Sequence, residues 1–118
     1  MLFRSAMTRR GAWNEPIGLI GIAVREDASG WLGYHVAPEA WGQGYATEAL
    51  RGLVAMTRLL TRMPRLTAGV MPDNPASKRV LVKAGFVRNG SGTFQTAFRG
   101  PIAVENFECN LQIGRAHV

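Results

Sequence analysis

The sequence predicts an α/β or α+β fold in which helices flank a mixed sheet, and three observations support this prediction. Segments 15–24, 31–37 and 65–71 are rich in Ile, Leu, Val or aromatic residues, which is typical of strands, and 15–24 is expected to be buried. Within 45–61, apolar residues ending at Leu60 recur at steps of three and four, which predicts one helical face. Glycine and proline separate these segments, and no internal repeat or linker interrupts them.

The remaining elements follow from local signals along the chain. Residues 1–8 are a weaker strand candidate, and Pro38 ends the strand before it because proline has no N–H to donate. Residues 72–86 predict a loop and then a helix, with Asn74 suited to the N-cap and Gly85 to the C-terminal end. The stretches "GTFQTAF" and "AVENFECNL" predict two closing strands joined by "RGP".

Composition favours one globular domain and restricts the classes of partner. The chain has 118 residues, 47% of them hydrophobic and 19% charged, so a modest core is expected and disorder is not. The net charge of +6 comes from scattered basic residues, so we do not expect a nucleic-acid partner; a basic surface equally attracts a phosphate-bearing ligand or an acidic protein. We expect Cys109 to be a plain strand residue rather than a nucleophile.

Localisation is predicted from three sequence features. No apolar run is long enough for a membrane-spanning helix, so no membrane partner is expected. The first ten residues lack the apolar region of a signal peptide. The single cysteine cannot form a disulfide within the chain, which fits a reducing compartment. We therefore expect a cytoplasmic protein.

The stretch "WGQGYA" (41–46) places two glycines between a strand and a helix. Glycine permits positive φ and close approach of a ligand, and the first amides of a helix have no internal partner. The helix dipole adds partial positive charge there, so the stretch is either an anion site or an ordinary strand-to-helix turn. It is not a Walker loop, because no G-K-[ST] follows, and Thr47 replaces the third glycine of the dinucleotide motif.

A second segment, "NPASKRVLVKAGF", follows after one helix and one strand. With both segments in this order, the chain resembles the GNAT superfamily of acetyl-CoA-dependent N-acetyltransferases, and more narrowly its ribosomal-protein N-terminal acetyltransferase branch (RimJ/RimL-like). The resemblance runs from about Gly18 to Phe86 and less clearly to Leu111. It implies a mixed, mostly antiparallel, twisted sheet with flanking helices. This is the acyl-CoA N-acyltransferase fold without its first strand and helices, which usually wall the acceptor site.

The resemblance implies acetyl-CoA as co-substrate, no metal, and direct transfer to a primary amine such as a protein N-terminal amine. The pyrophosphate would lie on the loop amides and the pantetheine arm along the end of strand 31–37. The N–H of Val36 or of Ala37 would then face the thioester carbonyl. The residues implied in cofactor binding are Val36, Ala37, Trp41, Gly42, Gln43, Gly44, Tyr45, Ala46, Thr47, Asn74 and Lys83. For Asn74 and Lys83 the alternatives are a plain helix cap and a solvated lysine.

Two residues are catalytic candidates. Ser77, three residues past Asn74, would lie near the sulfur, and its alternative is an exposed serine of a first helical turn. His35 is the candidate base because histidine titrates near neutral pH; its alternative is a satisfied core or edge residue. The superfamily often places an acid tyrosine seven residues after the asparagine, but Leu81 stands there. Tyr34 and the two neighbouring tryptophans would shape an acceptor pocket or simply pack.

The sequence also predicts how the chain is divided. Residues 113–118, "IGRAHV", continue no pattern, and the codon string that would encode them matches a sequencing-library adapter. We therefore expect a partial N-acetyltransferase (GNAT) domain over 1–112 and a non-native tail over 113–118. Two alternative functions remain: a non-catalytic CoA-binding module on the same fold, and a basic nucleic-acid-binding domain.

Overall fold

The computed structural model describes residues 2–12 and 14–112, and the expected non-native tail 113–118 lies outside them. The predicted order of strands and helices is confirmed, with one additional short 3-10 helix, η1. The elements are β1 (Leu2–Thr8), β2 (Pro16–Val24), β3 (Gly30–Val36), η1 (Pro38–Ala40), α1 (Tyr45–Leu60), β4 (Arg65–Val70), α2 (Pro75–Lys83), β5 (Val87–Thr96) and β6 (Gly100–Asn110).

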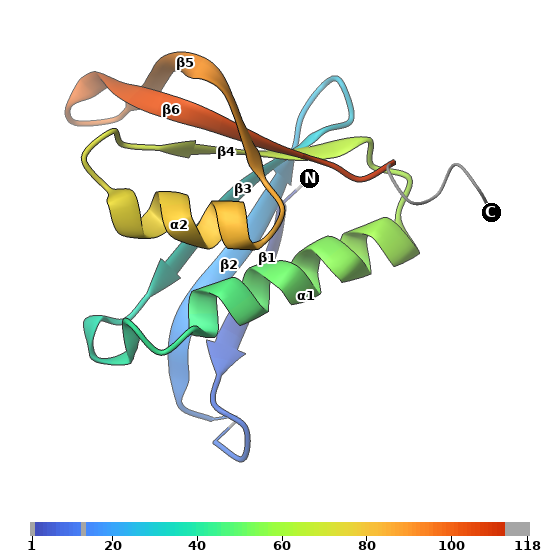
Figure 1. Ribbon diagram of the computed structural model, residues 1–118, viewed down its shortest axis with the longest axis vertical. Coiled ribbons are helices and arrows are strands. Elements are labelled where there is room, and N and C mark those ends of the chain that lie inside the picture. The colour runs from blue at the N-terminus through green and yellow to red at the C-terminus, as the bar shows by residue number, and fades with distance from the viewer. Residues whose placement is uncertain (1, 13, 113–118) are drawn as a thin grey trace.

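The strands form one six-stranded sheet in the order β1-β2-β3-β4-β6-β5. Every neighbouring pair is antiparallel except β3 and β4, which are parallel. This is the mixed, mostly antiparallel sheet that the resemblance implies. Both helices lie on the same face of it (Figure 1).

The parallel pair is short and opens into a fork. β3 and β4 pair only at Gly30 with Leu66 and at Trp31 with Thr67. Beyond these positions the two strands diverge, as Figure 1 shows. We call the gap between 32–36 of β3 and the end of β4 the fork. Backbone groups on its two edges are not used by the sheet, so the fork is where a ligand can reach the strands.

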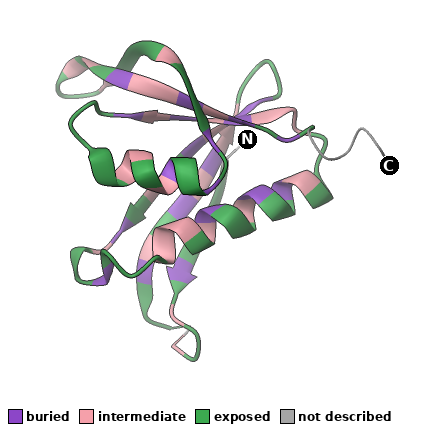
Figure 2. Ribbon diagram, in the orientation of Figure 1, coloured by how far each residue is buried: buried purple, intermediate pink, exposed green. Residues whose placement is uncertain are grey.

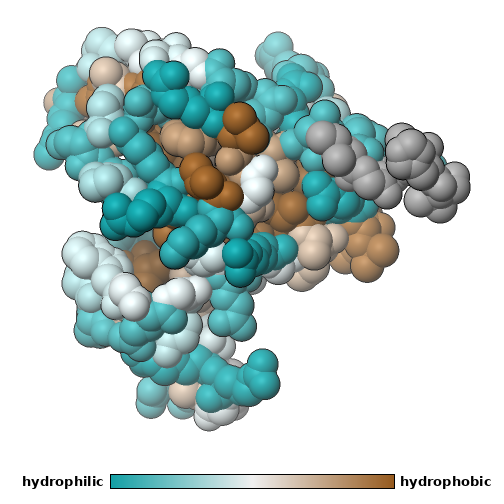
Figure 3. All heavy atoms as spheres, viewed as in Figure 1, coloured by the Kyte–Doolittle hydropathy of each residue, from teal (hydrophilic) through white to brown (hydrophobic). Residues whose placement is uncertain are grey.

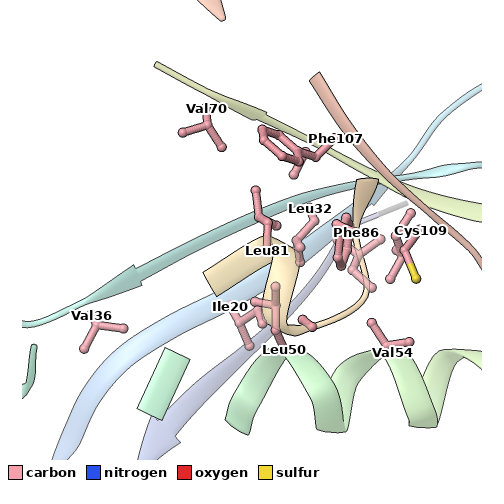
Figure 4. Packing of buried hydrophobic residues seen from close by; sticks show 14 of the residues in the cluster. Ile20, Leu32, Val36, Leu50, Val54, Val70, Leu81, Phe86, Phe107 and Cys109 are labelled. Carbon is pink, nitrogen blue, oxygen red and sulfur yellow. The ribbon is translucent and has the colours of Figure 1, made fainter. Parts of the chain in front are cut away.

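The core lies between the helices and the sheet face that they cover (Figure 2). Leu50 and Val54 of α1 and Leu81 of α2 point toward the sheet, beside Phe86 (Figure 4). Their partners on the sheet alternate along the strands, as period-two burial requires. These partners include Ile20, Ile22, Leu32, Val36, Leu66, Ala68, Val70, Phe107 and Cys109.

One expectation about burial is wrong, and the apolar face of α1 is covered only in part. The strand at 15–24 is buried on one face only: Ile20 is buried, but Leu19 is 56% exposed because α1 and α2 both lie on the other side of the sheet (Figure 1). Leu60, at the end of the predicted apolar helical face, is 70% exposed. Leu60 instead borders an open groove of about 1120 Å³ between β1 and α1, together with Phe3 and Met56.

Cys109 is a buried residue of β6, as expected for a plain strand position. Burial raises the pKa of its thiol, which keeps the sulfur protonated and unreactive at neutral pH. Across residues 2–12 and 14–112, no helix combines the length and apolar character needed to cross a membrane.

Candidate functional site

Gly42 and Gly44 shape the turn between η1 and α1. Both adopt left-handed backbone, with φ of +74° and +80°. A Cβ added at either position would meet no atom within 4 Å, so the φ angle rather than crowding requires glycine here. The open space beside both residues leaves their backbone accessible to a ligand.

α1 begins at Tyr45 without any side-chain cap. Its first helical hydrogen bond is donated by the N–H of Glu48 to the carbonyl of Gly44, at 3.0 Å. The amides of Tyr45, Ala46 and Thr47 precede that bond and therefore have no partner within the helix. The helix dipole adds partial positive charge at the same place, so this end of α1 has the geometry of an anion site.

Trp41 fixes the loop to the end of β3. Its indole Nε1 donates to the carbonyl of Val36 at 2.6 Å, although the residue is 64% exposed. The Trp41 amide donates to the carbonyl of Pro38 at 3.2 Å, which closes η1. The loop is therefore held against β3 by the Trp41 hydrogen bond as well as by the burial of Ala40 in the core.

α2 begins differently. Asn74 is its N-cap, and the side-chain Oδ1 accepts the N–H of Ser77 at 3.2 Å. Pro75 occupies the first turn, where its missing N–H costs nothing. The alternative role of Asn74, a helix cap, is thus present in the structure. A cap uses only Oδ1, so it leaves the side-chain amide nitrogen for other contacts.

A cavity of about 480 Å³, which we call the loop cavity, lies between the end of β3, the glycine turn, the start of α1 and α2. Figure 3 shows the corresponding notch between α2 and the loop below it. The cavity is lined by Val36, Trp41, Gly42, Gly44, Tyr45, Ala46, Thr47, Asn74 and Lys83 of the predicted cofactor set, and by both catalytic candidates, Ser77 and His35.

Ala37 and Gln43 are the two predicted cofactor residues outside that lining. The Ala37 amide donates to the carbonyl of Ile17 at 2.7 Å, so β2 already uses it. Gln43 turns its side-chain amide back to the carbonyl of Glu39, at 3.2 Å. Of the two amides expected to face the thioester carbonyl, the amide of Val36 is therefore the better candidate.

Tyr34 of β3 reaches across the fork to α2. Its hydroxyl lies 2.5 Å from Oγ of Ser77 and 3.3 Å from the Ser77 carbonyl. Partial burial raises the pKa of the phenol, and the hydrogen bond with Ser77 opposes that rise without cancelling it. Residue types and spacing alone predicted no catalytic part for Tyr34. The available signal was strand alternation, which places Tyr34 on the same face as Val36.

A second cavity of about 290 Å³, the strand cavity, borders the fork and shares Tyr34, Asn74 and Ser77 with the loop cavity. Its outer wall includes Trp31, whose ring is parallel to that of Phe94 with centroids 6.0 Å apart. The Tyr34–Ser77 pair therefore stands where two cavities meet.

His35 lies apart from that pair. It is an exposed residue of β3, and strand alternation places its side chain on the face opposite to Tyr34 and Val36. In the sheet it is paired with Leu19 of β2. His35 borders the loop cavity, but this orientation favours its alternative role as an edge residue.

Basic residues surround the loop cavity. Arg79 and Lys83 of α2 line it, and the Arg51 guanidinium of α1 donates twice to the carbonyl of Lys83, at 3.2 and 3.1 Å. These bonds fix the end of α2 relative to α1. No cluster of three His, Cys, Asp or Glu side chains suited to a metal occurs among the residues that the structure describes.

A forked sheet with an uncapped helix start beside the fork defines an α/β domain suited to a ligand that carries phosphate. The family profile described as the acetyltransferase (GNAT) domain matches residues 3–87. The chain belongs to the GNAT acetyltransferase family. Proteins of this family use acetyl-CoA.

One relative with a similar sequence also carries the name of an N-acetyltransferase. The chain is 35% identical over 78 residues to the uncharacterized N-acetyltransferase YoaA of Bacillus subtilis, an alignment that covers 64% of this chain and 44% of the relative. The chain thus spans less than half of the length of that protein.

Two solved structures share the fold. A ribosomal-protein-S5-alanine acetyltransferase from Vibrio fischeri superposes with a TM-score of 0.75 at 20% identity, over 84% of this chain and 56% of that one. AAC(6')-Ib in complex with paromomycin and acetyl-CoA superposes with a TM-score of 0.75 at 22% identity, over 94% of this chain and 66% of that one.

Proposed function

We propose that the chain carries the catalytic core of an N-acetyltransferase that moves the acetyl group of acetyl-CoA to a primary amine, such as a protein N-terminal amine. The observation that carries the proposal is the uncapped start of α1 beside the two left-handed glycines, facing the loop cavity. The pyrophosphate of CoA would accept hydrogen bonds from the amides of 44–47, with Lys83 at the cavity wall.

The positions of the lining groups support the following reaction. The amine nitrogen attacks the thioester carbonyl carbon, the C–S bond breaks, and its electron pair leaves with sulfur. The Val36 amide would donate to the carbonyl oxygen, which stabilises the developing negative charge. The Ser77 hydroxyl would donate to the leaving sulfur. The amine loses one proton and the thiolate gains one, so the step is balanced.

A non-catalytic CoA-binding module is the second candidate, and the position of His35 favours it. The predicted base lies on the outer strand face, away from the Tyr34–Ser77 pair. Such a module would bind CoA and release no thiol from acetyl-CoA with any amine, whereas an acetyltransferase releases CoA thiol with at least one.

Isothermal titration calorimetry with CoA tests the cofactor site. Gly44→Leu should weaken CoA binding about a hundredfold, because a Cβ at a positive φ displaces the turn and costs charge-assisted hydrogen bonds to the phosphates. Gly52→Leu is the matched control: a Cβ at Gly52 on α1 meets no atom within 4 Å, and the residue lies outside the loop cavity. No CoA binding by the unaltered chain, or equal binding by the Gly44 variant, contradicts the proposal.

A further inference from the structure

The Tyr34–Ser77 hydrogen bond joins two elements that the sequence keeps 43 positions apart. Tyr34 belongs to β3 and Ser77 to the first turn of α2, so the bond crosses the fork. Its 2.5 Å length makes Ser77 Oγ the main partner of the phenol, because the Ser77 carbonyl is 3.3 Å away. Both residues line both cavities.

Two proton arrangements are open to this pair, since each hydroxyl has one proton to donate. If Ser77 donates to Tyr34, the phenol proton turns to the Ser77 carbonyl and no donor is left for a ligand. If Tyr34 donates to Ser77 Oγ, the serine proton is free to point into the loop cavity. Only the second arrangement gives Ser77 a hydrogen bond for an atom of the ligand.

A phenol is a stronger hydrogen-bond donor and a weaker acceptor than an aliphatic alcohol, and this difference favours Tyr34 as the donor to Ser77 Oγ. Partial burial raises the pKa of the phenol, so Tyr34 keeps its proton across the neutral range. It acts by donating a hydrogen bond and not by giving up its proton.

We infer that Tyr34 is a positioning residue: its hydroxyl donates to Ser77 Oγ and so directs the Ser77 proton toward the sulfur of the leaving CoA thiolate. This inference rests on the proposed function, in which Ser77 faces that sulfur. Tyr34 retains its own proton throughout. The proton that the thiolate gains passes from Ser77 and is replaced by the one that the amine loses.

The test is a double-mutant cycle on thiol release from acetyl-CoA, using the chain with an amine that it acetylates. Tyr34→Phe keeps the ring and removes only the hydroxyl, and it should lower kcat about tenfold with the KM for acetyl-CoA unchanged. Ser77→Ala should lower kcat about a hundredfold. Because Tyr34 acts through Ser77, the double variant should equal Ser77→Ala alone.

A matched control removes a hydroxyl elsewhere. Thr67 of β4 is half-buried, donates to the Gly30 carbonyl at 3.3 Å and lines neither cavity at the fork. Thr67→Val should leave kcat unchanged. A second readout needs no turnover. When Tyr34 ionises, the Ser77 hydroxyl turns to donate to the phenolate, so Ser77→Ala should raise the pKa of Tyr34 further in a spectroscopic titration.

The outcomes separate the two proposals. Three outcomes overturn the inference while acetyl transfer stands. The first is an unchanged kcat in Tyr34→Phe. The second is a loss of kcat in the double variant that equals the product of the two single losses, and the third is an unshifted pKa of Tyr34 in Ser77→Ala. Absence of thiol release from the unaltered chain with every amine, alongside normal CoA binding, overturns the proposed transferase and this inference with it.

Discussion

The two helices begin at the same cavity, yet they treat their first amides in opposite ways. α1 starts after Gly44 with no side-chain cap, whereas α2 starts at Asn74, whose Oδ1 accepts the Ser77 amide. A capped start satisfies its amides within the chain, which stabilises the helix. An uncapped start leaves them for a ligand. Under the proposed function, α1 would bind the anion and α2 would hold side chains in place.

The largest expected effect comes from giving α1 a negative charge at its start. Gly44→Asp should weaken CoA binding about a thousandfold, because a carboxylate within about 4 Å of a phosphate costs ~4 kcal/mol near a protein surface. Gly44→Asn is the matched neutral variant, and asparagine tolerates the left-handed φ of +80° better than most residues. Calorimetry with CoA measures both; equal losses would mean that shape and not charge decides the site.

The next effect comes from removing the cap of α2. Asn74→Ala should lower the free energy of unfolding by about 1 kcal/mol, since Oδ1 no longer accepts the Ser77 amide. Urea denaturation measures the loss. Asn74→Asp retains an acceptor and should keep the stability. If Asp at this position also keeps full CoA affinity, Asn74 is a cap alone and does not hold the cofactor through its amide nitrogen.

The smallest effect is a gain in stability within α1. Gly52→Ala should raise the free energy of unfolding by roughly 0.5–1 kcal/mol, because glycine is a poor helix residue and the added Cβ meets no atom within 4 Å. Thermal denaturation followed by circular dichroism measures the gain. CoA affinity should not change. A loss of affinity would show that the start of α1 depends on flexibility in its middle.

The sequence predicted what depends on local signals. The glycine turn, the start of α1, the Asn74 cap and the order of the elements all follow from residue types at short spacing. Gly85, expected at the C-terminal end of the second helix, adopts φ +97° one residue after the C-cap Ala84. Family membership also followed, because two local motifs occur in the right order.

What the sequence did not predict depends on pairing between distant segments. Nothing local indicates that β3 and β4 separate after Trp31, and the contact between Tyr34 and Ser77 exists only because of that separation. The exposure of Leu60 likewise depends on what covers α1, which its helical period cannot tell. The position of His35, in contrast, could have been predicted from the sequence. Side chains alternate along a strand, so His35 must lie on the face opposite to that of its neighbour Val36.

Only two residue pairs join β3 to β4, and this affects how the two halves of the sheet are held together. The sheet consists of two three-stranded halves, β1-β2-β3 and β4-β6-β5, and strand pairing joins them only through the short contact between β3 and β4. One hydrophobic core spans both halves beneath the helices, so side-chain packing holds them together more than the backbone pairing of β3 and β4 does. The loop cavity takes Val36 from one half and residues of α2, which follows the other, so a ligand bound there would contact both halves. Under the proposed function, bound CoA would therefore stabilise the arrangement of the two halves.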